Sequence, residues 1–265
     1  MNKRYKSFTL FNYHEIPQIS ALTAGQKETI EIVGKVLPFK TNSYVINELI
    51  NWDNIPDDPI YTLTFPRKEM LAEEHFNKVK SLIDSNASPE ILKETINNIR
   101  LSLNPNPAGQ AHNVPEFEGE KLQGIQHKYR ETVLFFPSQG QTCHAYCTFC
   151  FRWPQFSNME GLKFAMKETD LLFRYLKSKP EVTDLLITGG DPLTMSTQIL
   201  KQYIEPLLNN KDLEHIRTIR IGTKSLAYWP YRFLTDTDSA ELLSFFEQVV
   251  KSLNRLPTEI MQSAC

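Results

Sequence analysis

The stretch TVLFFPSQGQTCHAYCTFC, residues 132–150, is the part of the chain from which the fold can be predicted. It begins with a continuous apolar run of the length of a buried strand, and three cysteines follow within eight residues. Two more segments of strand length, DLLIT at 184–188 and TIRI at 218–221, come later, and apolar residues at helical spacing follow each of them. Strands that alternate with amphipathic helices predict an α/β fold with a parallel sheet, whose functional loops lie at the carboxyl ends of the strands.

The sequence before this stretch predicts a helical region. Thr23 is a candidate N-cap for a helix that runs to Val36, and the sequence Ser-Pro-Glu at 88–90 opens another helix. The prolines of NPNPAG, residues 104–109, interrupt the helical periodicity because they remove backbone donors. We therefore predict an N-terminal helical region and linker over residues 1–123, and a β/α region over residues 124–265.

The composition excludes several classes of protein. With 265 residues, 41% of them apolar, and a net charge of −2, the chain is not intrinsically disordered. The charges are balanced and form no basic patch, so no nucleic-acid or membrane partner is expected. No stretch approaches the roughly 18 apolar residues of a membrane span, and the basic start does not lead into an apolar signal segment. We expect a cytoplasmic protein that acts on a small molecule.

The three clustered cysteines are the strongest chemical signal in the chain. Cys143, Cys147 and Cys150 have the spacing C-x3-C-x2-C in the loop after the first predicted strand. Thiolates this close can converge on one iron–sulfur centre, and three protein thiolates would leave one iron of a four-iron cluster open to another ligand. Two alternatives stay open: a zinc site with His144 or Cys265 as the fourth ligand, and ordinary buried thiols.

Two weaker motifs follow the second and third predicted strands. Gly189, Gly190 and Asp191 come at the end of the second strand, where glycines let backbone carbonyls approach a ligand closely. The same sequence, Gly-Gly-Asp-Pro, is also that of an ordinary turn. Thr223 stands at the end of the third strand, and Arg220 within that strand has either a structural or a solvated side chain.

With Phe149 directly before its last cysteine, the cysteine loop resembles the signature loop of the radical S-adenosylmethionine enzymes. The resemblance implies a partial β/α barrel in which the three cysteines hold a [4Fe-4S] cluster. It also implies that S-adenosylmethionine chelates the open iron, and that an electron from the cluster breaks a carbon–sulfur bond to give a 5′-deoxyadenosyl radical. The residues expected to contact this cofactor are Phe149, Gly189, Gly190, Asp191 and Thr223.

A narrower resemblance extends over about residues 99–246. The sequence His-Lys-Tyr at 127–129, Arg152, the glycine motif, and RIGTK at 220–224 followed by Pro230 and Arg232 together resemble the lysine 2,3-aminomutase family. The resemblance implies an isomerase, an intramolecular aminotransferase that uses an electron-donating reductant and pyridoxal phosphate for a 2,3-amino shift on lysine or a similar amino acid. Arg152 would pair with the substrate carboxylate, and Lys128 and Tyr129 would contact pyridoxal phosphate.

The chain also departs from the family pattern. Arg152 alone stands where the family has a run of arginines, Lys128 replaces an arginine, and Thr132 occupies another basic position. The lysine that holds pyridoxal phosphate comes later in the family than residue 265, so we expect a truncated or shortened member with an incomplete barrel.

We predict no further strand in the tail, residues 255–265. The open edge of the sheet would then need cover from another chain, as in a homo-oligomer. A non-catalytic iron–sulfur remnant or partner subunit without the pyridoxal phosphate site, and a zinc-binding module, are the alternative functions.

Overall fold

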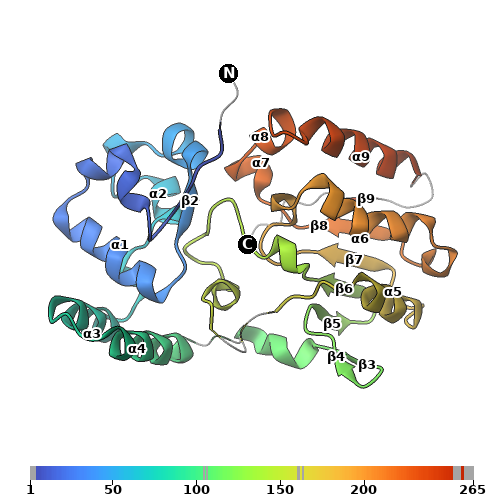
Figure 1. Ribbon diagram of the computed structural model, residues 1–265, viewed down its shortest axis with the longest axis horizontal. Helices are drawn as coiled ribbons and strands as arrows, with labels where there is room; N and C mark the ends of the chain where they lie inside the picture. Colours follow the sequence, from blue (N-terminus) through green and yellow to red (C-terminus); the bar gives the residue numbers. More distant parts are fainter. Residues whose placement is uncertain are drawn as a thin grey trace. The chain divides into compact units, whose positions relative to one another are not determined.

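The computed structural model describes residues 4–103, 105, 107–159, 162, 164–252 and 258–259. The chain forms two compact units that are interleaved in sequence (Figure 1). The helical unit contains residues 4–107 and 144–163, and the sheet unit contains residues 108–143 and 164–264. The segment with the three cysteines is therefore divided, because Cys143 ends one part of the sheet unit and the next residue belongs to the helical unit.

The helical unit agrees with the helices predicted from its sequence. Thr23 caps the first helix in a capping box, in which its side chain accepts from the Gln26 backbone and the Gln26 side chain accepts from the Thr23 backbone. Ser88 caps another helix by accepting from the backbone N–H of Ile91. The elements are β1 (Ser7–Thr9), α1 (Ala24–Val36), β2 (Lys40–Asn42), α2 (Pro59–Thr64), α3 (Glu73–Asp84) and α4 (Pro89–Ser102).

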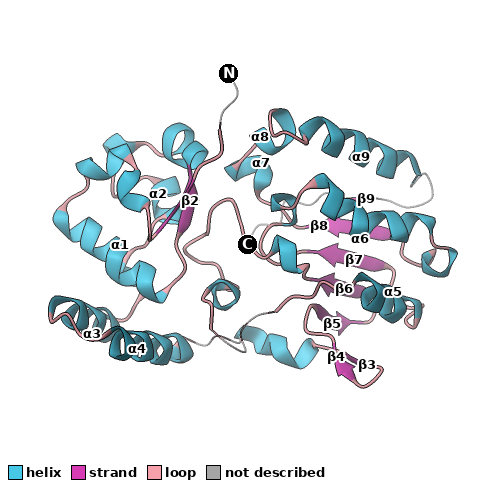
Figure 2. Ribbon diagram, viewed as in Figure 1, coloured by secondary structure: helices cyan, strands magenta, loops and turns pink. Residues whose placement is uncertain are grey.

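The apolar faces of three of these helices form one core. Helices α3 and α4 pack against each other and both contact α1 (Figure 2). The buried side chains at their centre come from all three helices and include Val33, Val36, Phe76, Val79 and Ile99. Strands β1 and β2 of the same unit pair antiparallel, with Phe8 opposite Thr41.

The sheet unit contains a small hairpin, a larger sheet and its helices. The hairpin is β3 (Glu116–Phe117) with β4 (Glu120–Lys121). The larger sheet has β5 (Ile125–Tyr129), β6 (Thr132–Phe135), β7 (Asp184–Ile187), β8 (Thr218–Ile221) and β9 (Thr258–Glu259), in this order. The helices are α5 (Thr169–Lys177), α6 (Thr197–Asn209), α7 (Ser225–Tyr228), α8 (Tyr231–Leu234) and α9 (Ser239–Ser252).

The three predicted strands are confirmed as neighbouring parallel strands. Strands β6, β7 and β8 align so that Phe135 lies beside Ile187, and Ile187 beside Ile221. The carboxyl ends of all three strands therefore lie at the same edge of the sheet. Strand β5 is antiparallel to β6, so the sheet is mixed and the α/β class is confirmed.

One prediction about the tail is wrong. Strand β9 pairs parallel with β8, with Thr258 beside Ile219 and Glu259 beside Arg220. The short sequence Thr-Glu carries no apolar run, so it gave no strand signal, whereas the open edge of β8 can pair with any backbone that reaches it. The edge that was expected to be open is thus partly covered within the chain itself.

Buried and half-buried residues alternate along the strands, and this alternation shows which face of the sheet carries the core. Residues Val133, Phe135, Leu185, Ile187, Ile219 and Ile221 belong to one core, together with apolar residues of α5, α6 and α9. The residues between them, including Leu134, Leu186 and Arg220, are only half-buried. Because side chains alternate along a strand, one face of the sheet carries the main core and the other is more accessible.

Candidate functional site

The three cysteines are present as half-buried thiols outside any disulfide. Cys143 lies in the sheet unit, and Cys147 and Cys150 lie in the helical unit. Within the described ranges, no three side chains of His, Cys, Asp or Glu are grouped so that they could hold a metal ion. The convergence of the three thiols on one centre therefore stays a prediction.

Backbone hydrogen bonds hold the turn that contains Cys147 and Cys150. The N–H of Cys150 donates to the carbonyl of Cys147 at 3.1 Å. The loop is also joined to the rest of the helical unit, since the N–H of Tyr146 donates to the Lys40 carbonyl at 2.8 Å. Thr148 donates from its N–H to the Leu63 carbonyl at 2.8 Å and from its hydroxyl to the Thr62 carbonyl at 3.0 Å. Two of the three predicted iron ligands are thus on a fixed backbone.

His144, the alternative zinc ligand, is buried in the helical unit with 6% of its surface exposed. Its carbonyl accepts from the side-chain amide of Asn42 at 3.0 Å, and its ring packs edge-on against Tyr5 with centroids 5.6 Å apart. Cys265, the other alternative fourth ligand, lies outside the described residues. Burial and packing of this kind are typical of a core residue.

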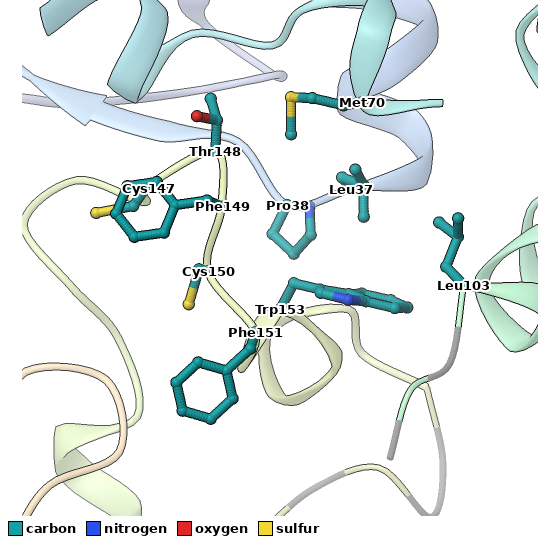
Figure 3. A pocket seen from close by; sticks show the side chains of 10 residues that line it. All are labelled: Leu37, Pro38, Met70, Leu103, Cys147, Thr148, Phe149, Cys150, Phe151 and Trp153. Carbon is teal, nitrogen blue, oxygen red and sulfur yellow. The ribbon is translucent and has the colours of Figure 1, made fainter. Parts of the chain in front are cut away.

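A cavity of about 350 Å³ lies beside the cysteine turn in the helical unit (Figure 3). The Sγ atoms of Cys147 and Cys150 point away from Leu37 and Pro38 on the opposite wall. The side chain of Phe149 is 56% exposed, so its ring is available to stack on a planar ligand. The wall is mainly apolar, lined by Leu37, Pro38, Met70, Leu103, Phe149, Phe151 and Trp153, together with the turn itself.

In the sheet unit, the predicted glycine motif contacts the loop that leads to Cys143. A Cβ atom at Gly190 would lie 2.3 Å from the Thr142 carbonyl oxygen and 2.5 Å from its nitrogen. Gly189 has a φ of +131°, and a Cβ atom there would lie 2.1 Å from the side-chain nitrogen of Gln141. Both glycines are therefore required for close packing of two loops. The sequence predicted either close approach to a ligand or an ordinary turn at these glycines, and it gave no sign of the packing against Gln141 and Thr142.

Asp191 and Thr223, both predicted to contact the cofactor, bind each other. The Asp191 side chain has 2% of its surface exposed and accepts from the Thr223 hydroxyl at 2.7 Å. It also accepts from the N–H groups of Leu193 at 2.9 Å and Lys224 at 2.8 Å, and from the Ser225 hydroxyl at 3.2 Å. Burial raises the pKa of Asp191, and these hydrogen bonds oppose that shift only in part. Direct contact of either residue with a cofactor stays a prediction.

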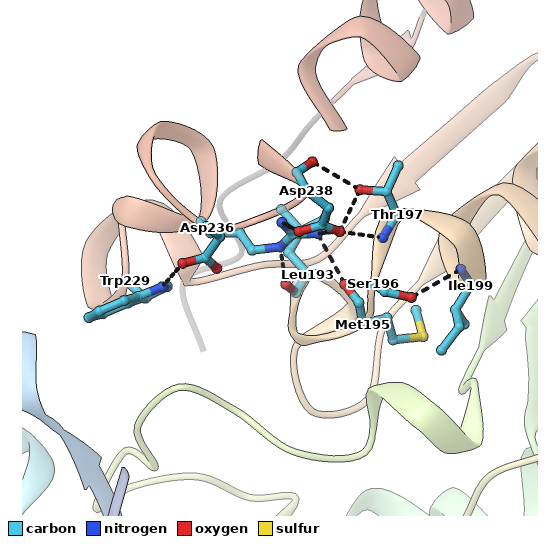
Figure 4. A network of polar contacts seen from close by, with 9 residues as sticks. Leu193, Met195, Ser196, Thr197, Ile199, Trp229, Asp236 and Asp238 are labelled. Atoms are coloured by element: carbon cyan, nitrogen blue, oxygen red, sulfur yellow. Dashed lines mark hydrogen bonds and ion pairs between the residues drawn. The ribbon is translucent and has the colours of Figure 1, made fainter. Parts of the chain in front are cut away.

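A second buried network holds the segment that follows the glycine motif (Figure 4). The Arg232 side chain donates to the carbonyls of Leu193 at 2.9 Å and Met195 at 3.2 Å, and to the Asp238 carboxylate at 2.6 Å. Asp238 also accepts from the N–H and the hydroxyl of Thr197, each at 2.8 Å. Burial alone would raise the pKa of Asp238, but the donors Thr197 and Arg232 outweigh it and lower the pKa.

Within the sheet unit, Lys128 and Tyr129 are not brought together with the glycine motif. Lys128 and Tyr129 are exposed at the end of β5, where Tyr129 pairs with Thr132, the first residue of β6. They lie at the amino edge of the parallel strands, opposite the edge where Gly190 follows β7. Arg152 lies in the helical unit, half-buried, with its guanidinium 5.3 Å from the centre of the Phe151 ring.

Two residues that hold the predicted loops in place, one in each unit, had no specific sequence signal. Ser225 donates to Asp191, and Arg100 in the helical unit donates to the carbonyls of Lys35, Val36 and Ser157 at 3.0, 2.6 and 3.1 Å. Arg100 therefore joins α1 and α4 to the segment after the cysteine turn. These partners are 34 to 65 residues away along the chain, a separation at which sequence periodicity carries no information.

Among the described helices, none is both long enough and apolar enough to cross a membrane.

No protein-family model matches the chain. Curated relatives do match it. A putative L-lysine 2,3-aminomutase of Aquifex aeolicus (strain VF5) is 30% identical over 228 residues, which are 86% of this chain and 50% of that protein.

Two further relatives agree in name. The L-lysine 2,3-aminomutase of Bacillus subtilis (strain 168) is 26% identical over 228 residues, 86% of this chain and 40% of that protein. The L-lysine 2,3-aminomutase of Clostridium subterminale is 28% identical over 152 residues, 57% of this chain and 35% of that protein. The chain spans half the length or less of these relatives. The similarity extends far beyond the cysteine loop, and the chain therefore belongs to the L-lysine 2,3-aminomutase family.

Proposed function

We propose that this chain is the iron–sulfur and S-adenosylmethionine-binding part of an aminomutase-type isomerase, with an amino acid such as lysine as substrate and an electron-donating reductant as partner. The observation that carries the proposal is the contact between the loop leading to Cys143 and the glycine motif, at the carboxyl ends of β6 and β7. In parallel sheets this edge is where ligands bind. The family relationship supplies the reaction class.

The chemistry of the three thiols is suited to a [4Fe-4S] cluster. Cys143, Cys147 and Cys150 are thiols outside any disulfide and only partly buried, so the metal can reach them. Thiolates are the usual ligands of such clusters, and three of them leave one coordination site for S-adenosylmethionine. When bound, the cluster and S-adenosylmethionine would supply one-electron cleavage of a carbon–sulfur bond and the resulting hydrogen-abstracting radical.

Residues of this chain would bind and orient S-adenosylmethionine and the substrate. The exposed ring of Phe149 offers a stacking surface for the adenine, next to the cysteine turn. Arg152 follows two residues after Cys150 and carries a permanent positive charge suited to a substrate carboxylate. The apolar wall of the cavity would exclude water from one side of the turn.

The residues present do not fit pyridoxal phosphate. Lys128 and Tyr129 are exposed at the amino edge of the sheet, opposite the glycine motif. A phosphate held there would be separated from the edge at which the cofactor is proposed to bind.

The test is anaerobic reconstitution of the full chain with iron and sulfide, followed by reduction in the presence of S-adenosylmethionine. We expect 5′-deoxyadenosine from the wild-type chain and background amounts from Cys147→Ala. Cys265→Ala, which removes a cysteine outside the loop, is the matched control and is expected to keep the wild-type yield. A wild-type yield equal to that of Cys147→Ala would reject the catalytic proposal.

Metal analysis of the same samples separates the alternatives. Iron and sulfide without 5′-deoxyadenosine would favour a non-catalytic cluster-carrying partner subunit. Zinc without iron would favour a zinc module. A cytoplasmic location follows from the proposal, because a reducing compartment keeps the three thiols available for metal.

A further inference from the structure

The loop that carries Cys143 and the loop that follows β7 make direct backbone contact inside the sheet unit. The N–H of Asp191 donates to the carbonyl of Thr142 at 2.6 Å. Gly190 packs so closely on Thr142 that a Cβ atom would collide with both its carbonyl oxygen and its nitrogen. Since Thr142 is bonded directly to Cys143, the position of the Cys143 backbone depends on this contact.

The Asp191 carboxylate joins the same contact to the exit of β8. It accepts from Thr223, from the N–H of Lys224 and from Ser225, which together form the turn after β8. One residue thus holds two neighbouring loops, the first through its N–H and the second through its carboxylate. A change at the carboxylate is transmitted to Thr142 because both groups belong to Asp191.

The carboxylate itself is inaccessible to a ligand as it stands. Its two oxygens accept four hydrogen bonds from within the chain, and 2% of the residue's surface is exposed. A buried carboxylate with this many hydrogen bonds can influence a bound cofactor through the backbone segments that it holds in place. For the carboxylate to contact the cofactor directly, the hydrogen-bond network would have to break.

We propose that Asp191, with Gly190, is a positioning residue that fixes Cys143 for metal binding by fastening the Thr142 carbonyl to the end of β7. The proposal differs from the expectation that Asp191 touches the cofactor itself. It deepens the proposed function, since the position of Cys143 matters for activity only if Cys143 binds iron.

The experiment measures alkylation of the full-length, metal-free chain by iodoacetamide under reducing conditions, with the rate at each cysteine followed by peptide mass spectrometry. The variants are Asp191→Asn, which places an amide NH2 against hydrogen-bond donors, and Gly190→Ala. The matched control is Gly25→Ala, where a Cβ atom meets nothing within 4 Å.

We expect Cys143 to react about tenfold faster in Asp191→Asn, the factor that corresponds to the loss of one hydrogen bond worth about 1.4 kcal/mol. Cys147 and Cys150 should keep their wild-type rates, because they are held by backbone bonds within the helical unit. Gly25→Ala should leave all three rates unchanged.

Unchanged Cys143 rates in both variants would overturn the proposal. An equal rise at all three cysteines would also overturn it, because that pattern indicates general loosening. If either variant fails to fold, Ser225→Ala removes a single donor, and a smaller rise confined to Cys143 is then expected; no rise there counts against the proposal.

Iron content after reconstitution keeps this inference separate from the proposed function. Faster alkylation of Cys143 together with reduced iron in Asp191→Asn supports both. If the wild-type chain holds no iron and Cys143 is still alkylated faster in Asp191→Asn, the result supports the positioning of Cys143 by Asp191 and rejects the iron–sulfur function.

Discussion

Replacing Arg232 by Met tests how strongly the sheet unit depends on its second buried network. Arg232 is 3% exposed and donates to two backbone carbonyls and to Asp238. Methionine fills a similar volume but leaves the Leu193 and Met195 carbonyls without this donor. Breaking a buried ion pair by removing one partner costs about 3–5 kcal/mol. We expect about 3 kcal/mol, the lower end of that range, because the Asp238 side chain is 26% exposed and keeps its bonds from Thr197.

Urea unfolding followed by circular dichroism measures this loss as a change in the free energy of unfolding. The matched control is Arg174→Met, which removes an ion pair with Glu118 in which the two side chains are 56% and 48% exposed. Such exposed pairs contribute less than about 1 kcal/mol. The reasoning is refuted if Arg232→Met and Arg174→Met destabilise the chain by the same amount, since burial of the network would then have no energetic consequence.

Three further predictions concern the ends of helices, alkaline pH and the cysteine turn. Thr23→Ala removes the capping box of α1 and should lower the free energy of unfolding by about 1 kcal/mol in urea, whereas Thr29→Ala, inside the same helix, should cost less. Burial, aided by the charge of Glu181, raises the pKa of Tyr175 to about 12, so its contribution to stability is complete below about pH 10 and is lost as the pH rises through 12; this slope should be absent in Tyr175→Phe. Arg100→Met should accelerate hydrogen exchange in the peptide 150–159 and leave the exchange rates of the sheet unit unchanged. An equal acceleration in both units would contradict this prediction.

The main helices and strands of the fold could be predicted from the sequence. The segments at 132–136, 184–188 and 218–221 have the length of a strand and are rich in Val, Ile, Leu, Phe and Thr, residues that pack well in a sheet. Thr23 identified the start of α1 because a cap acts within one turn of the chain. These signals are local, so a single sequence contains them in full.

The same kind of local signal also predicted which residues carry chemistry. Three cysteines within eight residues and a glycine pair after a strand are compact patterns, and the relatives found by comparison share the family that those patterns suggested. The identity of the ligands could thus be predicted, but their arrangement could not.

Tertiary structure alone decided how the patterns are used. The glycine pair accommodates the backbone of Thr142, the Asp191 carboxylate is saturated by donors 2 to 34 residues away, and β9 forms from a sequence without a strand signal. The tertiary structure also places Cys143 in the sheet unit, and Cys147 and Cys150 in the helical unit. Hydrogen bonds and close packing join residues that the chain brings together only after folding, so their partners cannot be inferred from spacing along the sequence.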